Sequence, residues 1–134
     1  MSNNHNQELD EEVLKNKLTP IAYAVLRNGA TEPPFSGVYN QHFKTGDYHC
    51  LVCENLLFQS THKFESGCGW PSFDAAVSGA ITYLRDNSHG MIRTETRCAQ
   101  CDSHLGHVFD DGPNHTTGKR YCINSVCLEF SPTN

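Results

Sequence analysis

Cys50-Leu51-Val52-Cys53 and Cys98-Ala99-Gln100-Cys101 are the two stretches of this 134-residue sequence that decide its fold. In each stretch two residues separate the cysteines, which lets both sulfur atoms of a pair face one cation across a tight turn. Two such pairs complete a tetrahedral site in which protein fills every coordination position. The spacing therefore predicts a structural zinc site that joins two distant hairpins.

Two other interpretations of these four cysteines stay open. They fit two unrelated pairs in the hydrophobic core, because free cysteine is one of the most buried residue types. They also fit an all-thiolate iron cage, as in rubredoxin-like electron carriers. The colour of the purified protein separates the two metals, since the iron protein is red and the zinc protein is colourless.

The length and charge of the chain exclude several classes of protein. A chain of 134 residues is long enough to bury one hydrophobic core. Its net charge is −5, so it lacks the positive charge that binding to nucleic acid or to an anionic membrane requires. No apolar run approaches the roughly 18 to 20 residues of a membrane span. The polar, acidic residues 3–12 do not resemble a secretory signal. We therefore expect a cytoplasmic protein with reduced cysteines, and a monomer, because no apolar surface stripe is evident.

Local patterns predict a short helical lead-in. We expect a disordered tail over residues 1–6 and a single domain over residues 7–134. Apolar residues recur at helical spacing over residues 9–18. Thr19-Pro20 predicts the start of a second helix, because it combines a capping hydroxyl with proline at the first helical position, and Asn28-Gly29 predicts its end.

The rest of the chain is expected to be β structure. Between residues 36 and 130, short segments rich in β-branched and aromatic residues alternate with turn residues. The segments 91–97 and 121–130 are predicted strands, the second being the longest. The fold class expected is α+β, mainly antiparallel β.

The predicted strand over residues 121–130 carries a candidate reactive thiol. Side chains alternate between the two faces of a strand, so Arg120, Cys122 and Asn124 share one face, and Cys127 lies on the other as inert packing. The guanidinium of Arg120 favours the thiolate form and lowers the pKa of Cys122. The amide of Asn124 can hold a developing oxygen charge or a water molecule. Cys122 is therefore a candidate nucleophile, although a small core cysteine fits these residues equally well.

Two further segments carry residues suited to the same chemistry. His104 and His107 are candidate proton donors, because histidine exchanges protons near neutral pH, although each alone is more often a surface or hydrogen-bonded core residue. Cys68 lies between two glycines on a loop that can bring its thiol to another thiol. Trp70, the only tryptophan, follows on this loop, where the commoner role of such a residue is to anchor the core.

Taken together, these motifs resemble those of methionine-R-sulfoxide reductase B. Four segments carry the likeness: residues 67–73 (GCGWPSF), 104–109 (HLGHVF), 111–113 (DGP) and 120–125 (RYCINS). The two Cys-x2-Cys pairs match the zinc-binding members of that family. The likeness runs in order over residues 18–130, which is nearly the entire chain.

The resemblance implies two antiparallel β sheets with small N-terminal helices, and a zinc knot formed by Cys50, Cys53, Cys98 and Cys101. It implies reduction of methionine-R-sulfoxide in peptides and proteins, with thioredoxin as the reductant. Cys122 matches the nucleophile, which becomes a sulfenic acid, and Cys68 matches the resolving cysteine that then forms a disulfide with it. The remaining matches are Trp70 for the substrate S-methyl group, Phe109 for a pocket wall, His104, His107 and Asn124 for the sulfoxide oxygen or a nearby water, and Arg120 beside the nucleophile.

Two questions and one further alternative function remain at this point. The sequence leaves open which histidine is the acid, and whether the Cys68 loop already lies near Cys122 or must move to it. A zinc-knot module that binds partners without catalysis shares the paired cysteines, because fold alone does not decide function. Such a module does not need a nucleophile beside Arg120 and Asn124.

Overall fold

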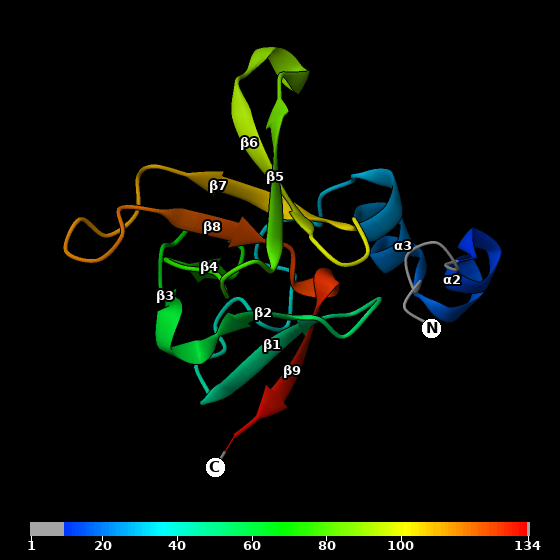
Figure 1. Ribbon diagram of the computed structural model, residues 1–134, viewed down its shortest axis with the longest axis horizontal. Coiled ribbons are helices and arrows are strands. Elements are labelled where there is room, and N and C mark those ends of the chain that lie inside the picture. Colours follow the sequence, from blue (N-terminus) through cyan, green and yellow to red (C-terminus); the bar gives the residue numbers. More distant parts are fainter. Residues whose placement is uncertain (1–9, 134) are drawn as a thin grey trace.

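The computed structural model describes residues 10–133, which contain two short helices and nine strands (Figure 1). The predicted disordered tail over residues 1–6 lies outside the described residues. Figure 1 shows the helices at one end of the molecule, away from the long loop over residues 110–119. The strands are β1 (Gly46–Cys50), β2 (Leu56–Gln59), β3 (Lys63–Phe64), β4 (Ser72–Phe73), β5 (Ile81–Asp86), β6 (Arg93–Cys98), β7 (His104–Phe109), β8 (Arg120–Ile123) and β9 (Leu128–Pro132).

The two helices begin and end at the residues that cap them. Helix α2 (Glu11–Lys17) has Asp10 as its N-cap, with acidic residues in its first turn, where the helix dipole favours them. In α3 (Pro20–Asn28) the Thr19 hydroxyl accepts a hydrogen bond from a backbone N–H at 3.2 Å, and Gly29 ends the helix at a φ of 76°. The predicted bounds of the second helix are therefore confirmed. Neither described helix is long and apolar enough to cross a membrane.

The strands form two antiparallel sheets, so the expected α+β, mainly β fold class is confirmed. The small sheet has the order β2-β1-β9, and the large sheet has the order β3-β4-β8-β7-β6-β5. The core lies between the sheets, where Phe58 of β2 stacks on Phe73 of β4 with ring centroids 4.3 Å apart. Both rings are fully buried.

The prediction of one long strand over residues 121–130 is wrong. Strand β8 ends at Ile123, a 3₁₀ turn η3 (Ser125–Cys127) follows, and β9 then joins the small sheet. The alternation of side chains therefore holds for Arg120 and Cys122 and stops there. The strand predicted over residues 91–97 is present as β6, two residues later at its start.

Candidate active site and metal centre

The two Cys-x2-Cys turns have the same backbone geometry. One turn follows β1 and the other follows β6. In each turn the residue after the second cysteine, Glu54 or Asp102, has a positive φ, of 69° and 63°. The N–H of that residue donates to the carbonyl of the first cysteine, Cys50 or Cys98, at 2.8 Å. Because left-handed backbone costs about 1–2 kcal/mol in residues other than glycine, both turns depend on surrounding interactions.

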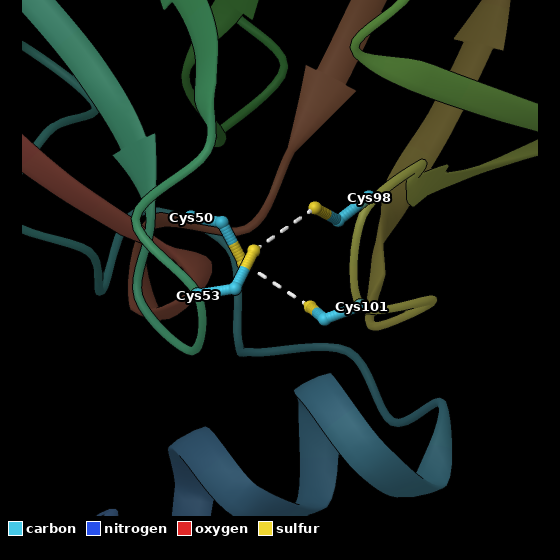
Figure 2. A group of neighbouring side chains, drawn as sticks. All are labelled: Cys50, Cys53, Cys98 and Cys101. Carbon is cyan, nitrogen blue, oxygen red and sulfur yellow. Dashed lines mark hydrogen bonds between the residues drawn. The ribbon is translucent and has the colours of Figure 1, made fainter. Parts of the chain in front are cut away.

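The sulfur atoms of these turns point toward one another from the two sheets (Figure 2). All four lie within 4.8 Å, with Cys50 and Cys101 3.6 Å apart and Cys53 and Cys98 3.5 Å apart. A tetrahedral ion with metal–sulfur bonds of about 2.3 Å requires sulfur atoms about 3.8 Å apart. The four cysteines are therefore positioned to bind a metal ion, as the spacing predicted. Because β1 belongs to the small sheet and β6 to the large one, such an ion joins the two sheets.

Cys122 lies near the middle of the six-stranded sheet. The register of β8 pairs it with Ser72 of β4 on one side and with His107 of β7 on the other. Side chains paired across antiparallel strands lie on the same face, so His107 stands beside Cys122, and Arg120 shares that face two residues earlier.

A cavity of about 240 Å³ opens over this face of the sheet. It brings together residues from the loop before β4, from β7, from β8 and from the residue after β8. His104 is the one predicted active-site residue that does not line it. The predicted residues that do line it are Cys68, Trp70, His107, Phe109, Arg120, Cys122 and Asn124.

The Cys68 loop already holds its thiol against Cys122. The two Sγ atoms are 3.4 Å apart, and closing a disulfide of about 2.05 Å needs only a small approach. Gly67 and Gly69 have φ values of 77° and 96°, which favour glycine. A side chain at Gly69 would also press against Pro34. The sequence left open whether this loop lies near Cys122 or must move to it, and in the structure it already lies there.

The contact between the thiols of Cys68 and Cys122 shifts their two pKa values in opposite directions. The pKa of Cys68 is lowered to about 4, chiefly by its hydrogen bond with Cys122 and also by its hydrogen bonds with the hydroxyls of Ser66 and Ser72. The same contact with Cys68, together with burial, raises the pKa of Cys122 well above its usual value, and Arg120 only opposes this effect. Arg120 favours the thiolate of Cys122, as predicted, while the contact with Cys68 opposes it, so the ionisation of Cys122 stays a prediction.

Two side chains of the cavity wall are held by polar contacts. The guanidinium of Arg120 forms a two-bond ion pair with Asp111, at 2.8 and 3.2 Å, and lies 4.5 Å over the ring of Phe109. The indole N–H of Trp70 donates to the carbonyl of Glu32 at 3.0 Å. Arg120 and Trp70 are therefore fixed in orientation before any ligand arrives.

Each histidine of the 104–109 motif is held by a carboxylate. Nε2 of His107 lies 2.8 Å from Asp86, and Nδ1 of His104 lies 2.7 Å from Glu95. Burial lowers the pKa of His107, and the Asp86 carboxylate partly opposes that shift. His104 is buried behind it, with the two ring centroids 5.7 Å apart. The motif therefore places one imidazole in the cavity and a second one behind it.

The amide of Asn124 is mostly committed within the protein. Its Oδ1 accepts from the N–H of Glu32 at 2.9 Å, and its Nδ2 donates to the carbonyl of Leu105 at 2.9 Å. A side-chain amide has two N–H donors, so one remains for a ligand in the cavity that Asn124 lines.

Known proteins resemble this chain over most of its length. Residues 18–132 match the SelR domain. The peptide methionine sulfoxide reductase MsrB of Thioalkalivibrio sulfidiphilus is 58% identical over 133 residues, which cover 97% of this chain and 96% of the relative. The MsrB of Pseudomonas savastanoi pv. phaseolicola is 60% identical over 119 residues, covering 88% and 90%.

The chain belongs to the SelR family. The resemblance drawn from its motifs is therefore confirmed. A solved structure, the Mis18 "Yippee-like" domain, matches 68% of this chain and 99% of its own length with a TM-score of 0.51 and 17% identity. That likeness shows a shared fold alone.

In this SelR-family chain, sequence reasoning missed the residues that support the site. Asp86, Arg93 and Glu95 lie on the β5–β6 hairpin, and only the register of neighbouring strands brings them to the histidines. Gly106 was also missed, although a side chain there would collide with the carbonyl of Cys122. A single carboxylate in a strand does not indicate which residue it will contact. Gly106, in contrast, lies inside the 104–109 motif, so its position could have been recognised from the sequence.

Proposed function

We propose that this protein reduces methionine-R-sulfoxide in peptides and proteins to methionine, using thioredoxin as its dithiol donor. The observation that carries the proposal is the pair of thiols, Cys122 and Cys68, 3.4 Å apart in a cavity walled by Trp70 and Phe109. The names of the MsrB relatives at 58% and 60% identity support the same substrate.

The cavity suits a sulfoxide because it combines an apolar wall with a few polar groups. The ring of Trp70 receives the S-methyl group, and the ring of Phe109 completes the apolar side. The free N–H of Asn124 and the imidazole of His107 face the oxygen. These contacts present the sulfur atom of the sulfoxide to Cys122.

The reduction begins with the thiolate of Cys122, which forms beside the Arg120 cation when its proton passes to Cys68. The Cys122 thiolate attacks the sulfoxide sulfur and forms an S–S bond, and the sulfoxide oxygen takes a proton from a histidine. We assign this role to His107, because it lines the cavity. The hydroxyl then passes to the sulfur of Cys122 as the S–S bond breaks, so methionine leaves as a thioether and Cys122 is oxidised to a sulfenic acid.

Cys68 then resolves the sulfenic acid. Its sulfur bonds to the sulfur of Cys122, and the hydroxyl leaves with a proton as water. A dithiol restores the enzyme by exchange, and both of its electrons pass to the disulfide. A second cavity of about 490 Å³ reaches Cys68 and not Cys122, between Ser66 and Pro113, and gives the reductant a separate approach.

The four-cysteine site holds one structural zinc ion in this proposal, and its thiolates take no part in the reaction. An all-thiolate site with every position filled by protein suits zinc and leaves no place for substrate. Elemental analysis of colourless protein should find zinc, whereas a red protein would indicate iron. We further propose a cytoplasmic monomer that binds neither nucleic acid nor membrane.

An assay with separate sulfoxide epimers tests the proposed function. With dithiothreitol as donor, the R epimer should be reduced and the S epimer should not. Cys122→Ser should abolish the reaction while the protein stays folded and metal-loaded. The matched control Cys127→Ser should remain active, because Cys127 lies outside the cavity. Turnover of the R epimer by Cys122→Ser, or no turnover by the wild type, would reject the proposal.

A further inference from the structure

Glu32 is a buried carboxylate that the proposed reaction does not use. Its side chain is 1% exposed, and it forms no ion pair with any residue from 10 to 133. Its two oxygens instead accept hydrogen bonds from consecutive backbone N–H groups of the turn η3, those of Ser125 and Val126, each at 3.0 Å. A buried charge needs such donors, because leaving it unpaired is costly.

The backbone of the same residue contacts both walls of the cavity. The N–H of Glu32 donates to Oδ1 of Asn124 at 2.9 Å, and its carbonyl accepts from Nε1 of Trp70 at 3.0 Å. One residue therefore joins three elements: the Cys68–Trp70 loop, the residue that follows β8, and the turn η3.

The segment of the chain that follows Glu32 packs tightly over this contact. Gly37 lies so close to Ser125 and to the Glu32 carboxylate that a side chain there would collide with both. The N–H of Tyr39 donates to the Ser125 hydroxyl at 3.2 Å, which fixes the same segment from the other side. Glu32 is therefore held in place and has no room to change its rotamer freely.

We infer that Glu32 is a positioning residue that sets the separation between the Trp70 ring and the Asn124 amide. The inference rests on the proposed function. The methyl group and the oxygen of the substrate are bonded to one sulfur atom, so both contacts form together only if ring and amide are correctly spaced. A shift of about 1 Å at such a site can cost about 100-fold in rate.

The first test replaces Glu32 with glutamine, which keeps the shape of the side chain and removes one acceptor. The new NH₂ group faces a backbone N–H of η3, which loses its partner. We expect kcat/KM for methionine-R-sulfoxide to fall about 10- to 100-fold. Fluorescence of Trp70, the only tryptophan, should change in the folded, substrate-free protein. Glu129→Gln, at an exposed position of β9, is the matched control and should leave both unchanged.

A double-mutant cycle separates positioning from mere stability. If Glu32 acts through Asn124, the loss caused by Glu32→Gln should shrink in an Asn124→Ala background, because the two effects are not additive. A purely structural role would lower the melting temperature and leave the fluorescence and the kcat/KM of the folded enzyme unchanged. That result in Glu32→Gln would overturn the inference.

A second variant covers the case in which Glu32→Gln does not fold. Glu32→Asp keeps both acceptors on a shorter side chain and should show a smaller change of fluorescence and of kcat/KM. Wild-type values of both in folded Glu32→Asp would then overturn the inference. If the wild type reduces neither epimer, the proposed function fails. The fluorescence comparison still tests whether Glu32 positions Trp70.

Discussion

The three cysteines outside the metal centre differ in reactivity because of what each sulfur touches. Cys122 and Cys68 face a cavity and each other, and neighbouring hydroxyl groups help to lower the pKa of Cys68. Cys127 is fully buried, where desolvation raises its pKa, and its thiol donates to the carbonyl of His104 at 3.3 Å. A neutral, enclosed thiol is unreactive, so only the cavity pair is suited to redox chemistry.

Replacing Cys68 with serine should allow one turnover and block recycling. Cys122 still becomes a sulfenic acid, but no second thiol in the cavity can convert it to a disulfide. A quench experiment should find about one equivalent of methionine per enzyme molecule, and thioredoxin-driven turnover should fall to background. Cys127→Ser is the control and should recycle normally. Full thioredoxin-driven activity in Cys68→Ser would show that Cys68 is not the resolving cysteine.

Residue identity in short motifs was enough to predict most of the cavity. Cys68 with Trp70, His107 with Phe109, and Arg120 with Cys122 each lie in one motif, so local sequence preserves their association. Asp86, Glu95 and Glu32 were missed because their partners are distant in sequence. Their contacts arise from strand register and from a loop that crosses the turn η3, and neither can be read from composition.

At the level of elements, the strand predicted over residues 121–130 failed for a local reason. Apolar residues continue to alternate after Ile123, so the pattern predicts one strand. In the structure the turn η3 interrupts the strand, and its N–H groups donate hydrogen bonds to the buried Glu32 carboxylate. The chain then continues as β9, which belongs to the other sheet. A turn stabilised by a side chain about 90 residues away is invisible to periodicity.

The β5–β6 hairpin should tune the protonation of His107 through two opposite charges. Asp86 raises the pKa of His107 and Arg93 lowers it, against a burial effect that is larger than either. Asp86→Asn should therefore move this pKa further down, and Arg93→Gln should move it up. NMR titration of the His107 ring protons measures both shifts. Shifts of the same sign in the two variants would contradict this account.

The sign of the resulting pH dependence follows from that lowered pKa. Below a pH of about 6.5, His107 binds a proton in the unfolded chain but stays neutral in the folded protein until the pH is lower. The contribution of His107 to stability therefore falls as the pH drops. The contribution is fully present above the pKa of the unfolded chain. Arg93→Gln should make this acid-side loss smaller, because it brings the folded pKa closer to the unfolded one.

Across the whole molecule, the two sheets are held together in different ways at different points. The aromatic stack of Phe58 on Phe73 packs one sheet on the other, and the chain itself crosses between them at η3. The cysteine turns after β1 and β6 supply a third connection, with ligands from both sheets. The cavity belongs to the large sheet, so the metal centre acts on it only through the stability of the fold.

Loss of the metal ion should therefore unfold the domain more readily without altering its chemistry. Cys50→Ser removes one of four ligands, and we expect its melting temperature to fall by about 10 °C or more, because loss of a structural metal costs several kcal/mol and 1 kcal/mol corresponds to about 4 °C. Elemental analysis should show less zinc per chain. Cys127→Ser, which removes a buried thiol and no ligand, should melt much closer to the wild type. Equal melting temperatures for Cys50→Ser and the wild type would mean that the sheets do not depend on the ion.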